Sequence, residues 1–241
     1  MIKKLKTIAI IPARSGSKGL PGKNVKILLG KPLISWSIES ALSSKNIDLV
    51  IVSTDSQEIA DLSIKFGAEV PFLRPKNLSD DYASSFSVVE HAIKYYKNEK
   101  NINFDLVALL EPTSPIREND DIDNMIDKLF SNYDNKDAII SLGEVSEYPF
   151  LMKTLDKDFS INKYINLESK SFRRQDQKKL YFPFGVAYIS KVSTLLIEKT
   201  FYPKRSLGYI LKKYQNYEVD DIYDFICIES LLRYRKKNKD D

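Results

Sequence analysis

The stretch Pro12-Ala-Arg-Ser-Gly-Ser-Lys-Gly-Leu-Pro-Gly-Lys-Asn24 directly follows the apolar run Ile8-Ala-Ile-Ile11. It holds three of the chain's eight glycines together with the cations Arg14, Lys18 and Lys23. Small residues let successive backbone N–H groups turn toward one anion, and the cations can balance the charge of a triphosphate. The spacing is neither that of a P-loop, because no Ser or Thr follows Gly-Lys, nor that of the dinucleotide fingerprint. The stretch predicts a phosphate cradle after a buried strand, and the alternative is an ordinary glycine-rich turn with solvated lysines.

Short apolar runs recur along the chain, with longer amphipathic stretches between them. The runs cover residues 8–11, 49–52, 69–72, 106–110 and 138–142, and the amphipathic stretches cover residues 32–43, 57–66, 84–98 and 119–131. Near-continuous apolarity is what strands covered on both faces require. This alternation predicts a Rossmann-like α/β fold with a mainly parallel sheet flanked by helices. In such sheets ligands bind beyond the carboxyl ends of the strands.

The alternation breaks after Gly143. Residues 144–182 are rich in aromatic and charged side chains with weak periodicity, which predicts an insertion that projects from the sheet rather than a second domain. Regular structure is expected to resume with strands at 185–189 and 209–213 and a final helix at 220–235. Residues 1–241 are therefore interpreted as a single domain, since this length suffices for one core.

Composition restricts the classes of function. A formal net charge of +4 argues against a nucleic-acid binder, and no apolar run is long enough to span a membrane. The densest basic run, residues 233–239, is interpreted as a solvated helix end rather than a binding patch. Cys227 is the only cysteine, which excludes an intrachain disulfide, and its apolar neighbours predict a buried thiol. These features favour a cytoplasmic protein.

The glycine-rich stretch closely resembles the opening signature of the acylneuraminate cytidylyltransferases, also called CMP-sialic acid synthetases, and more loosely that of the CMP-Kdo synthetases. Later blocks agree with the family in order: Val52-Ser-Thr-Asp55, Leu73-Arg-Pro75, Ser79-Asp-Asp-Tyr-Ala-Ser-Ser85, Leu110-Glu-Pro-Thr-Ser-Pro-Ile-Arg117, Arg173-Arg-Gln-Asp-Gln177 and Glu218-Val-Asp-Asp221. The resemblance spans nearly the whole chain. It implies the nucleotide-diphospho-sugar transferase fold and transfer of CMP from CTP to a sialic-acid-like 2-keto-3-deoxy sugar acid, with release of pyrophosphate. Such a step belongs to sugar-nucleotide biosynthesis for cell-surface polysaccharide.

The resemblance also implies roles for single residues. The residues that would bind the nucleotide come from the first blocks, and they are Arg14, Ser15, Gly16, Lys23, Asn24, Arg74, Ser84, Ser85 and Glu111. Arg14 and Lys23 would act in catalysis together with Asp220, which matches the family's metal-binding aspartate. Asp220 and Glu218 would hold Mg²⁺ or Mn²⁺, because these hard cations prefer oxygen ligands. Two residues keep simpler readings: Arg74 as a surface loop cation, and Asp224 as an acid at a helix N-terminus.

On the sugar side the resemblance implies binding roles for Lys153, Arg173, Arg174, Gln177 and Phe184. Two positions depart from the family's pattern, since Glu111 stands where relatives commonly carry Gln and Phe184 where they commonly carry Asn. A carboxylate at 111 would repel a sugar acid unless a cation or hydroxyl meets it. The acceptor thus stays open among neuraminate, legionaminate and pseudaminate. The alternative functions are a nucleotidyltransferase for another sugar acid or sugar phosphate, and an inactive nucleotide-binding homologue.

In the family the inserted segment crosses to a second subunit, so the resemblance implies a homodimer. Aromatic side chains around the insertion fit a buried contact between subunits, and they are Tyr148, Phe150, Phe159, Tyr164, Phe172, Tyr181 and Phe182. The alternative is that these side chains cap the core of one subunit. The lone histidine, His91, lies in a helical pattern and is assigned a packing or surface role.

Overall fold

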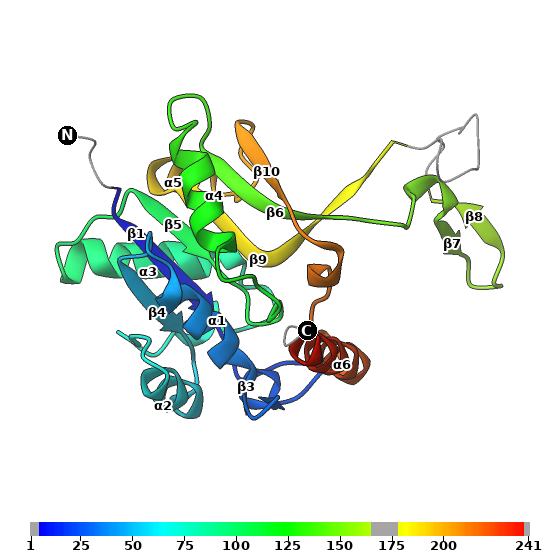
Figure 1. The fold of residues 1–241 in the computed structure, drawn as a ribbon, viewed down its shortest axis with the longest axis horizontal. Coiled ribbons are helices and arrows are strands. Elements are labelled where there is room, and N and C mark those ends of the chain that lie inside the picture. Colours follow the sequence, from blue (N-terminus) through cyan, green and yellow to red (C-terminus); the bar gives the residue numbers. More distant parts are fainter. Residues whose placement is uncertain (1–4, 165–177, 239–241) are drawn as a thin grey trace.

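A six-stranded sheet forms the centre of the structure (Figure 1). The computed structural model describes residues 5–164 and 178–238. From edge to edge the sheet consists of β10 (Ser206–Ile210), β6 (Ala138–Glu144), β9 (Tyr181–Lys191), β5 (Leu106–Leu109), β1 (Thr7–Pro12) and β4 (Leu49–Ser53). β4, β1 and β5 pair in parallel, as do β6 and β10, whereas β9 is antiparallel to both its neighbours. The prediction of a mainly parallel sheet is confirmed.

The direction of β9 follows from how the chain reaches it. A crossover helix returns the chain to the opposite end of the sheet and gives a parallel strand. Here the chain leaves the end of β6 in an extended insertion and re-enters the sheet at the same end, where Glu144 faces Tyr181. The apolar run at 185–189 predicted a strand at this place but neither its direction nor its full length.

Helices cover both faces of the sheet (Figure 1). One apolar core is shared by α1 (Leu33–Ser43), α2 (Gln57–Lys65) and α4 (Asp121–Phe130), and the other by α3 (Ser85–Glu99) and α5 (Val192–Glu198). Alternate residues of β1 serve the two cores, with Ile11 in the first and Ile10 in the second. A strand covered on both faces therefore reads as an unbroken apolar run. Across residues 5–164 and 178–238, no helix is both long and apolar enough to cross a membrane.

The last helix, α6 (Ile222–Lys237), closes over the glycine-rich stretch. Its inner residues Phe225 and Ile228 share a third apolar cluster with Leu20 and Val219. A capping box starts the helix, because the Asp221 carboxylate accepts hydrogen bonds from the first-turn backbone while the Asp224 carboxylate accepts from the backbone N–H of Asp221. The reading of Asp224 as a helix N-terminal acid is confirmed.

Cys227 is exposed, so the prediction of a buried thiol is wrong. The apolar neighbours that suggested burial, Phe225 and Ile228, occupy the inner face of α6. Helix residues one or two positions apart point in different directions, so Cys227 does not share the inner face with Phe225 and Ile228 and lies on the outer face. His91 contacts the Phe72 ring edge-on, with ring centroids 4.5 Å apart, in agreement with the packing role assigned to it.

Several element boundaries differ from the predictions. Residues 69–72 form no strand, because Pro71 has no N–H to give a ladder. Isolated bridges lie at Glu69 and at Leu73, just after this run. The strand expected at 209–213 lies earlier, as β10. Helix α5 and the short strands β2 (Ile27–Leu28) and β3 (Lys31–Pro32) were not predicted, since each is too short to show a periodic pattern.

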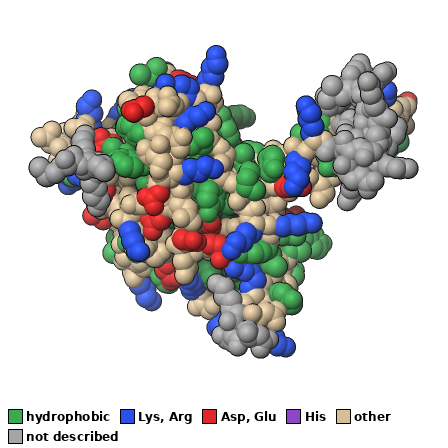
Figure 2. Space-filling view, turned by 45° about the horizontal axis from the view of Figure 1, so that its top comes forward, with side chains coloured by type: hydrophobic (Ala, Val, Ile, Leu, Met, Phe, Trp, Pro, Cys, Tyr) green, Lys and Arg blue, Asp and Glu red, His purple; other side chains and the backbone are tan. Residues whose placement is uncertain are grey.

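The insertion projects from the body as an arm between β6 and β9 (Figure 1). Its described part contains a two-stranded hairpin, β7 (Lys153–Leu155) and β8 (Ile161–Lys163), and joins the body through a narrow neck (Figure 2). Apolar side chains on the hairpin are exposed: Leu155 is 63% exposed, Phe159 80% and Ile161 69%. Of the aromatic side chains for which a capping role was the alternative reading, Phe159, Tyr164 and Phe182 are exposed and do not cap the core of their own subunit, whereas Phe172 lies outside the described residues.

Asp137 joins the amino ends of β6 and β10 to the carboxyl end of the antiparallel β9, at the end of the sheet opposite the carboxyl ends of β1 and β5. Its carboxylate accepts two hydrogen bonds from Arg205, at 2.6 and 2.8 Å, and one from Lys191 at 3.1 Å. The hydrogen bonds from Arg205, followed by those from Lys191, lower the pKa of Asp137 to about 2. A charged carboxylate thus anchors the starts of β6 and β10 and the end of β9.

Candidate functional site

A cavity of about 440 Å³ lies at the carboxyl ends of β1 and β5, next to the start of α6. This is the edge of the sheet at which ligand binding was predicted. Three segments supply its polar lining: the glycine-rich stretch with Arg14, Lys18, Lys23 and Asn24, the loop after β5 with Glu111, and the segment before α6 with Glu218 and Asp220.

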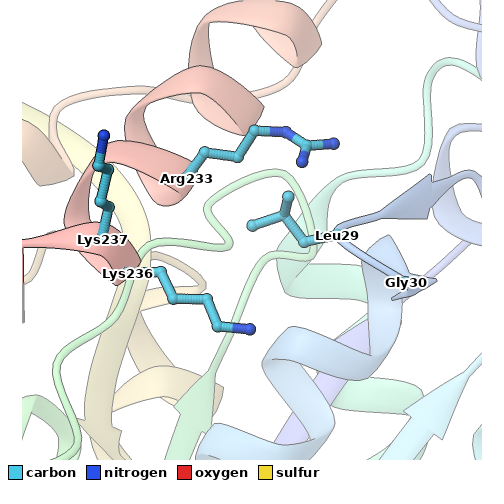
Figure 3. Close-up of a pocket in the computed structure, with 5 residues that line it drawn as sticks. All are labelled: Leu29, Gly30, Arg233, Lys236 and Lys237. Atoms are coloured by element: carbon cyan, nitrogen blue, oxygen red, sulfur yellow. The ribbon is translucent and has the colours of Figure 1, made fainter. Parts of the chain in front are cut away.

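A second hollow, of about 500 Å³, lies between the last turns of α6 and the turn that joins β2 to β3 (Figure 3). It is lined by Leu29, Gly30, Arg233, Lys236 and Lys237. Arg233 pairs with Glu229 one turn earlier in the helix, and cations at a helix C-terminus interact favourably with the helix dipole. Since no residue predicted to carry chemistry lines this hollow, the cavity at the strand ends is the candidate site.

The glycine-rich stretch folds back on itself beside the cavity. Gly22 has a φ of 65°, in the left-handed region that favours glycine, and it starts the 3-10 turn Lys23–Val25. The amide of Asn24 donates to the carbonyl oxygen of Arg14 at 3.0 Å and so joins the two ends of the loop. A Cβ atom on Gly19 would lie 2.3 Å from the carbonyl oxygen of Asp220, so the loop packs directly against the acidic segment.

Lys23 connects the basic and acidic walls of the cavity. Its ammonium donates to the carbonyl oxygen of Val219 at 2.6 Å and lies 3.7 Å from the Asp220 carboxylate. The Lys23 side chain is 14% exposed, whereas the Asp220 side chain is 84% exposed. The lysine is therefore fixed in place, and the carboxylate of Asp220 remains accessible to a ligand.

Arg14 and Lys18 converge on a single anion. The carboxylate of Asp81 accepts from Arg14 at 2.7 Å and contacts the Lys18 ammonium at 2.5 Å. The hydrogen bonds from Lys18 and then Arg14 lower the pKa of Asp81. One negatively charged group can thus bridge both cations, which is the geometry that a phosphate group requires.

Asp55 and Arg74 form a polar layer behind the loop. The backbone N–H and the hydroxyl of Ser15 both donate to the Asp55 carboxylate, each at 2.9 Å. Arg74 is 6% exposed, and its Nε and Nη2 atoms have no hydrogen-bond partner within the described part of the chain. Burial lowers the pKa of Arg74, with Asp55 opposing this effect and Arg14 adding to it. Buried donors without partners are rare in native proteins.

Two carboxyl groups, those of Glu111 and Glu218, meet at the inner end of the cavity. The Glu218 carboxylate accepts from the Ser114 hydroxyl at 2.7 Å and from the backbone N–H of Gly185 at 2.6 Å. A Cβ on Gly185 would lie 2.5 Å from the Glu111 carboxylate and 2.9 Å from that of Glu218, so this glycine lets the two acids approach. Burial and, next, the charge of Glu218 raise the pKa of Glu111 to about 7.

Arg117 supports the acidic end from beneath. Its guanidinium donates to the carbonyl oxygens of Glu111 at 2.7 Å, Gly185 at 3.0 Å and Val186 at 2.8 Å, and to the Ser37 hydroxyl at 2.8 Å. Burial lowers the pKa of Arg117 to about 10, which leaves it charged at neutral pH. This one side chain fixes the loop after β5 to β9 and α1.

The model of the cytidylyltransferase family matches residues 8–239 of the chain. The chain belongs to the cytidylyltransferase family. It is 36% identical over 221 residues to the pseudaminic acid cytidylyltransferase of Campylobacter jejuni, covering 91% of this chain and 93% of that protein. It is 30% identical over 238 residues to the CMP-N,N'-diacetyllegionaminic acid synthase of Legionella pneumophila, covering 97% and 99%.

Other relatives in the family are longer. The chain is 34% identical to the N-acylneuraminate cytidylyltransferase of Escherichia coli, and the match covers 98% of this chain but 54% of that protein. The chain therefore spans about half the length of the N-acylneuraminate cytidylyltransferases that it matches. Among solved structures, CMP:2-keto-3-deoxy-manno-octonic acid synthetase complexed with CTP has a TM-score of 0.69 at 16% identity, covering 95% of this chain and 99% of that one. This likeness shows that the chain has a Rossmann-like fold.

The predicted site residues fall into three groups. Those in the cavity lining are Arg14, Lys23, Asn24, Glu111, Glu218 and Asp220. Arg74 and Ser15 belong to the layer behind the loop, where burial rules out the reading of Arg74 as a surface cation. Gly16 belongs to the same loop but is absent from the cavity lining, while Ser84 caps α3 and Ser85 is its first residue.

Of the sugar-side residues, the two that the structure describes, Lys153 and Phe184, do not line the cavity of their own chain. Lys153 lies on β7 in the arm, away from the body (Figure 1), and Phe184 packs against Phe182 with ring centroids 5.4 Å apart. Arg173, Arg174 and Gln177 lie outside the described residues. Local sequence patterns did not single out Arg117 or Gly185, because their partners come from distant segments. The only local sign of a structural role for Arg117 was its place as a single arginine at the end of a proline-rich loop.

We expect Gly19→Ala to lower the free energy of unfolding by about 1–3 kcal/mol, since the new Cβ would overlap the Asp220 carbonyl oxygen. Gly16→Ala is the matched control in the same loop, because a Cβ there meets nothing within 4 Å. Urea denaturation of both variants measures the difference. Equal stability of the two variants would contradict the close packing of the loop on the acidic segment.

We expect Glu111→Gln to change how stability depends on pH. The pKa of Glu111 is about 7 in the folded chain against an ordinary value of 4.5, so the folded state holds a proton that the unfolded state has lost between these values. Stability therefore falls as pH rises from 4.5 to 7. The glutamine variant should be more stable than the parent by about 3 kcal/mol at pH 8 and equal to it at pH 4. Denaturation curves across this range measure it, with the exposed Glu58→Gln as control; a constant difference at all pH values would count against the shifted pKa.

Proposed function

We propose that the chain transfers CMP from CTP to a nonulosonic acid, a sialic-acid-like 2-keto-3-deoxy sugar acid, and releases pyrophosphate. The observation that carries this proposal is the meeting of a cationic loop with an acidic segment in one cavity, joined by Lys23. Relatives named for pseudaminic and legionaminic acids, matched over more than nine-tenths of both chains, support it.

Arg14, Lys18 and Lys23 are assigned to the phosphates of CTP. Asp81 already bridges Arg14 and Lys18, so a triphosphate would take the place of its carboxylate. Arg74 is assigned to the nucleoside, because its two donors without partners lie buried behind the same loop. Arginine presents a planar set of donors that suits the acceptor atoms of a base or sugar.

Glu218 and Asp220 are assigned to a divalent cation, Mg²⁺ or Mn²⁺. Within the described segments no group of three His, Cys, Asp or Glu side chains could hold a metal ion by itself. Mg²⁺ in nucleotide sites is usually held by one or two carboxylates together with substrate phosphates. The residues fit this type of site, since mutual repulsion of Glu111, Glu218 and Asp220 contributes to the raised pKa of Glu111. A cation bound there would reduce that repulsion and polarise the α-phosphate.

The other residues of the site are assigned to aligning the substrates and to balancing the charge of the phosphates. The anomeric hydroxyl of the acceptor attacks the α-phosphorus of CTP, and the bond between the α- and β-phosphates breaks. Arg14, Lys18 and Lys23 offset the charge of the departing pyrophosphate, and their positions are set by the folded loop. Positioning and electrostatics supply most of the rate in such transfers, which need no protein nucleophile.

The direct test is turnover with a panel of acceptors. We expect CTP, but not ATP, GTP or UTP, to give pyrophosphate and a CMP-sugar by mass spectrometry with N-acetylneuraminic, legionaminic or pseudaminic acid. Asp220→Ala should abolish this turnover while the fold persists, and Asp134→Ala, an exposed aspartate in the turn before β6, is the matched control. Turnover only with another sugar acid or a sugar phosphate, or CTP binding without pyrophosphate release, would overturn the proposal.

We also propose that the chain forms a homodimer through the arm, which supplies Lys153 and its neighbours to the partner's cavity. The exposed apolar side chains of the hairpin support this arrangement. Light scattering should give a molar mass twice that of one chain. The double substitution Phe159→Ser and Ile161→Ser should lower this molar mass to that of one chain. Ile197→Ser is the control, because Ile197 on α5 is as exposed, at 80%, as Phe159. A monomer for the unsubstituted chain, or no effect of the hairpin serines, would contradict the role of the arm.

A further inference from the structure

The acidic segment before α6 is held by the loop that follows β5. The backbone N–H of Val219 donates to the carbonyl oxygen of Thr113 at 2.8 Å, and the Ser114 hydroxyl donates to the Glu218 carboxylate at 2.7 Å. These contacts fix the middle of the segment. They do not by themselves fix the chain that enters the segment or the helix that leaves it.

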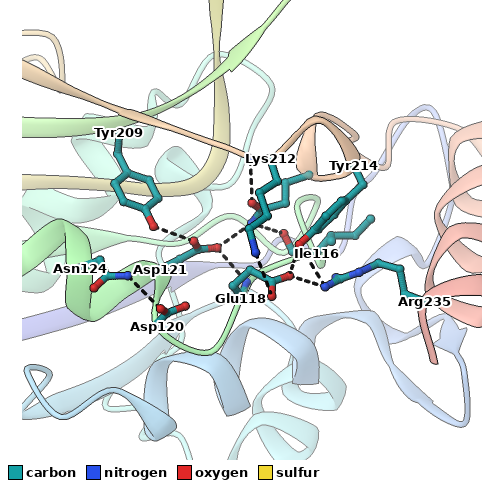
Figure 4. Close-up of polar contacts among 10 residues, drawn as sticks. Ile116, Glu118, Asp120, Asp121, Asn124, Tyr209, Lys212, Tyr214 and Arg235 are labelled. Carbon is teal, nitrogen blue, oxygen red and sulfur yellow. Dashed lines mark hydrogen bonds and ion pairs between the residues drawn. The ribbon is translucent and has the colours of Figure 1, made fainter. Parts of the chain in front are cut away.

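Glu118, farther along the same loop, contacts both of these flanking parts (Figure 4). Its carboxylate accepts from the Tyr214 hydroxyl at 2.8 Å and from Arg235 at 2.5 Å, with Lys212 at 3.9 Å. The Arg235 guanidinium lies over the Tyr214 ring, 4.0 Å from its centroid. Tyr214 belongs to the 3-10 turn Lys213–Gln215, which comes just before the acidic segment. Arg235 belongs to the last turn of α6, the helix that begins directly after the acidic segment.

This arrangement corrects one prediction from the sequence at a single residue, since Arg233, Lys236 and Lys237 are exposed as predicted. The basic run at 233–239 was interpreted as a solvated helix end, but Arg235 is 18% exposed and Glu118 is 15% exposed. Arg235 therefore serves as a structural partner of Glu118. Burial alone would raise the pKa of Glu118, but the hydrogen bonds from Tyr214 and Arg235 outweigh it and hold the pKa below its ordinary value. The carboxylate is charged at neutral pH.

The base of this cluster is itself anchored. The Asp121 carboxylate accepts from the backbone N–H of Glu118 at 2.8 Å, from Gln215 at 2.6 Å and from the Tyr209 hydroxyl at 3.0 Å. Asp121 and Gln215 are 3% and 1% exposed. Glu118 thus stands on a buried network that reaches β10 and α4, as Figure 4 shows. A side chain supported in this way can transmit a fixed position to its own partners.

We propose that Glu118 is a positioning residue that sets the affinity of Glu218 and Asp220 for a divalent cation. It acts by holding both flanks of the acidic segment, Tyr214 on one side and Arg235 on the other. The inference rests on the proposed function in assigning the cation to Glu218 and Asp220. Groups that orient ligand side chains without touching the ion are known to affect metal affinity strongly.

The test measures Mn²⁺ binding in the presence of CTP, by electron paramagnetic resonance, independently of turnover. We expect Glu118→Gln to weaken Mn²⁺ affinity about tenfold, and Tyr214→Phe, which keeps the ring beneath Arg235, to weaken it less. In turnover the Mg²⁺ concentration at half-maximal rate should rise similarly, while the KM for CTP at saturating Mg²⁺ stays near that of the parent.

Asp137→Asn is the matched control, since Asp137 is another buried carboxylate bound by an arginine and a lysine, at the opposite edge of the sheet. It should lower the melting temperature without changing Mn²⁺ affinity. Unchanged Mn²⁺ affinity in Glu118→Gln, or an equal loss in Asp137→Asn, overturns the positioning role. If Glu118→Gln does not fold, Tyr214→Phe decides by the same measurement. If no acceptor supports turnover yet Mn²⁺ and CTP bind together, the proposed function fails and the positioning role is still decided by the binding data.

Discussion

The contact between the Lys23 ammonium and the carbonyl oxygen of Val219 joins the first loop of the chain to its last acidic segment. Residues nearly two hundred positions apart thereby form one cavity with a basic wall and an acidic wall. A triphosphate and a divalent cation carry opposite charges, and a site that binds both must present both signs within a few ångströms. Lys23 lies 3.7 Å from Asp220 without covering it, so the acid keeps most of its surface for a ligand.

Two arginines show how the fold supports this charge separation. Arg117 donates hydrogen bonds to backbone carbonyl oxygens and to the Ser37 hydroxyl, and these bonds hold the loop after β5 against β9. Arg74 is also largely buried, yet its Nε and Nη2 atoms have no partners in the described chain. Burying a charged group costs free energy unless it is paired, so Arg117 offsets this cost within the fold, whereas Arg74 offsets it only in part.

The sequence predicted those features that are encoded locally. The glycine-rich stretch, the alternation of apolar runs and helices, and the acidic segment before α6 all depend on neighbours along the chain, and the structure contains each of them. Features that depend on distant partners escaped prediction. Arg235 looked like part of a solvated basic tail because Glu118 is far away in sequence, and β9 gave no sign of its antiparallel direction. The prediction that Cys227 is buried was wrong for a simpler reason: apolar residues next to it in the sequence, such as Phe225 and Ile228, lie on the opposite face of the helix.

The environment of Glu111 changes the meaning of its departure from the family's glutamine. As a carboxylate it would repel a sugar acid, which made the acceptor side of the site uncertain in the sequence. With a pKa of about 7, however, the buried side chain holds a proton in a large share of molecules at neutral pH. A protonated carboxyl offers one donor and one acceptor in nearly the geometry of a primary amide. Glu111 can therefore fill the role of glutamine without adding a full negative charge. Burial and the nearby Glu218 together raise this pKa in the chain without a bound cation.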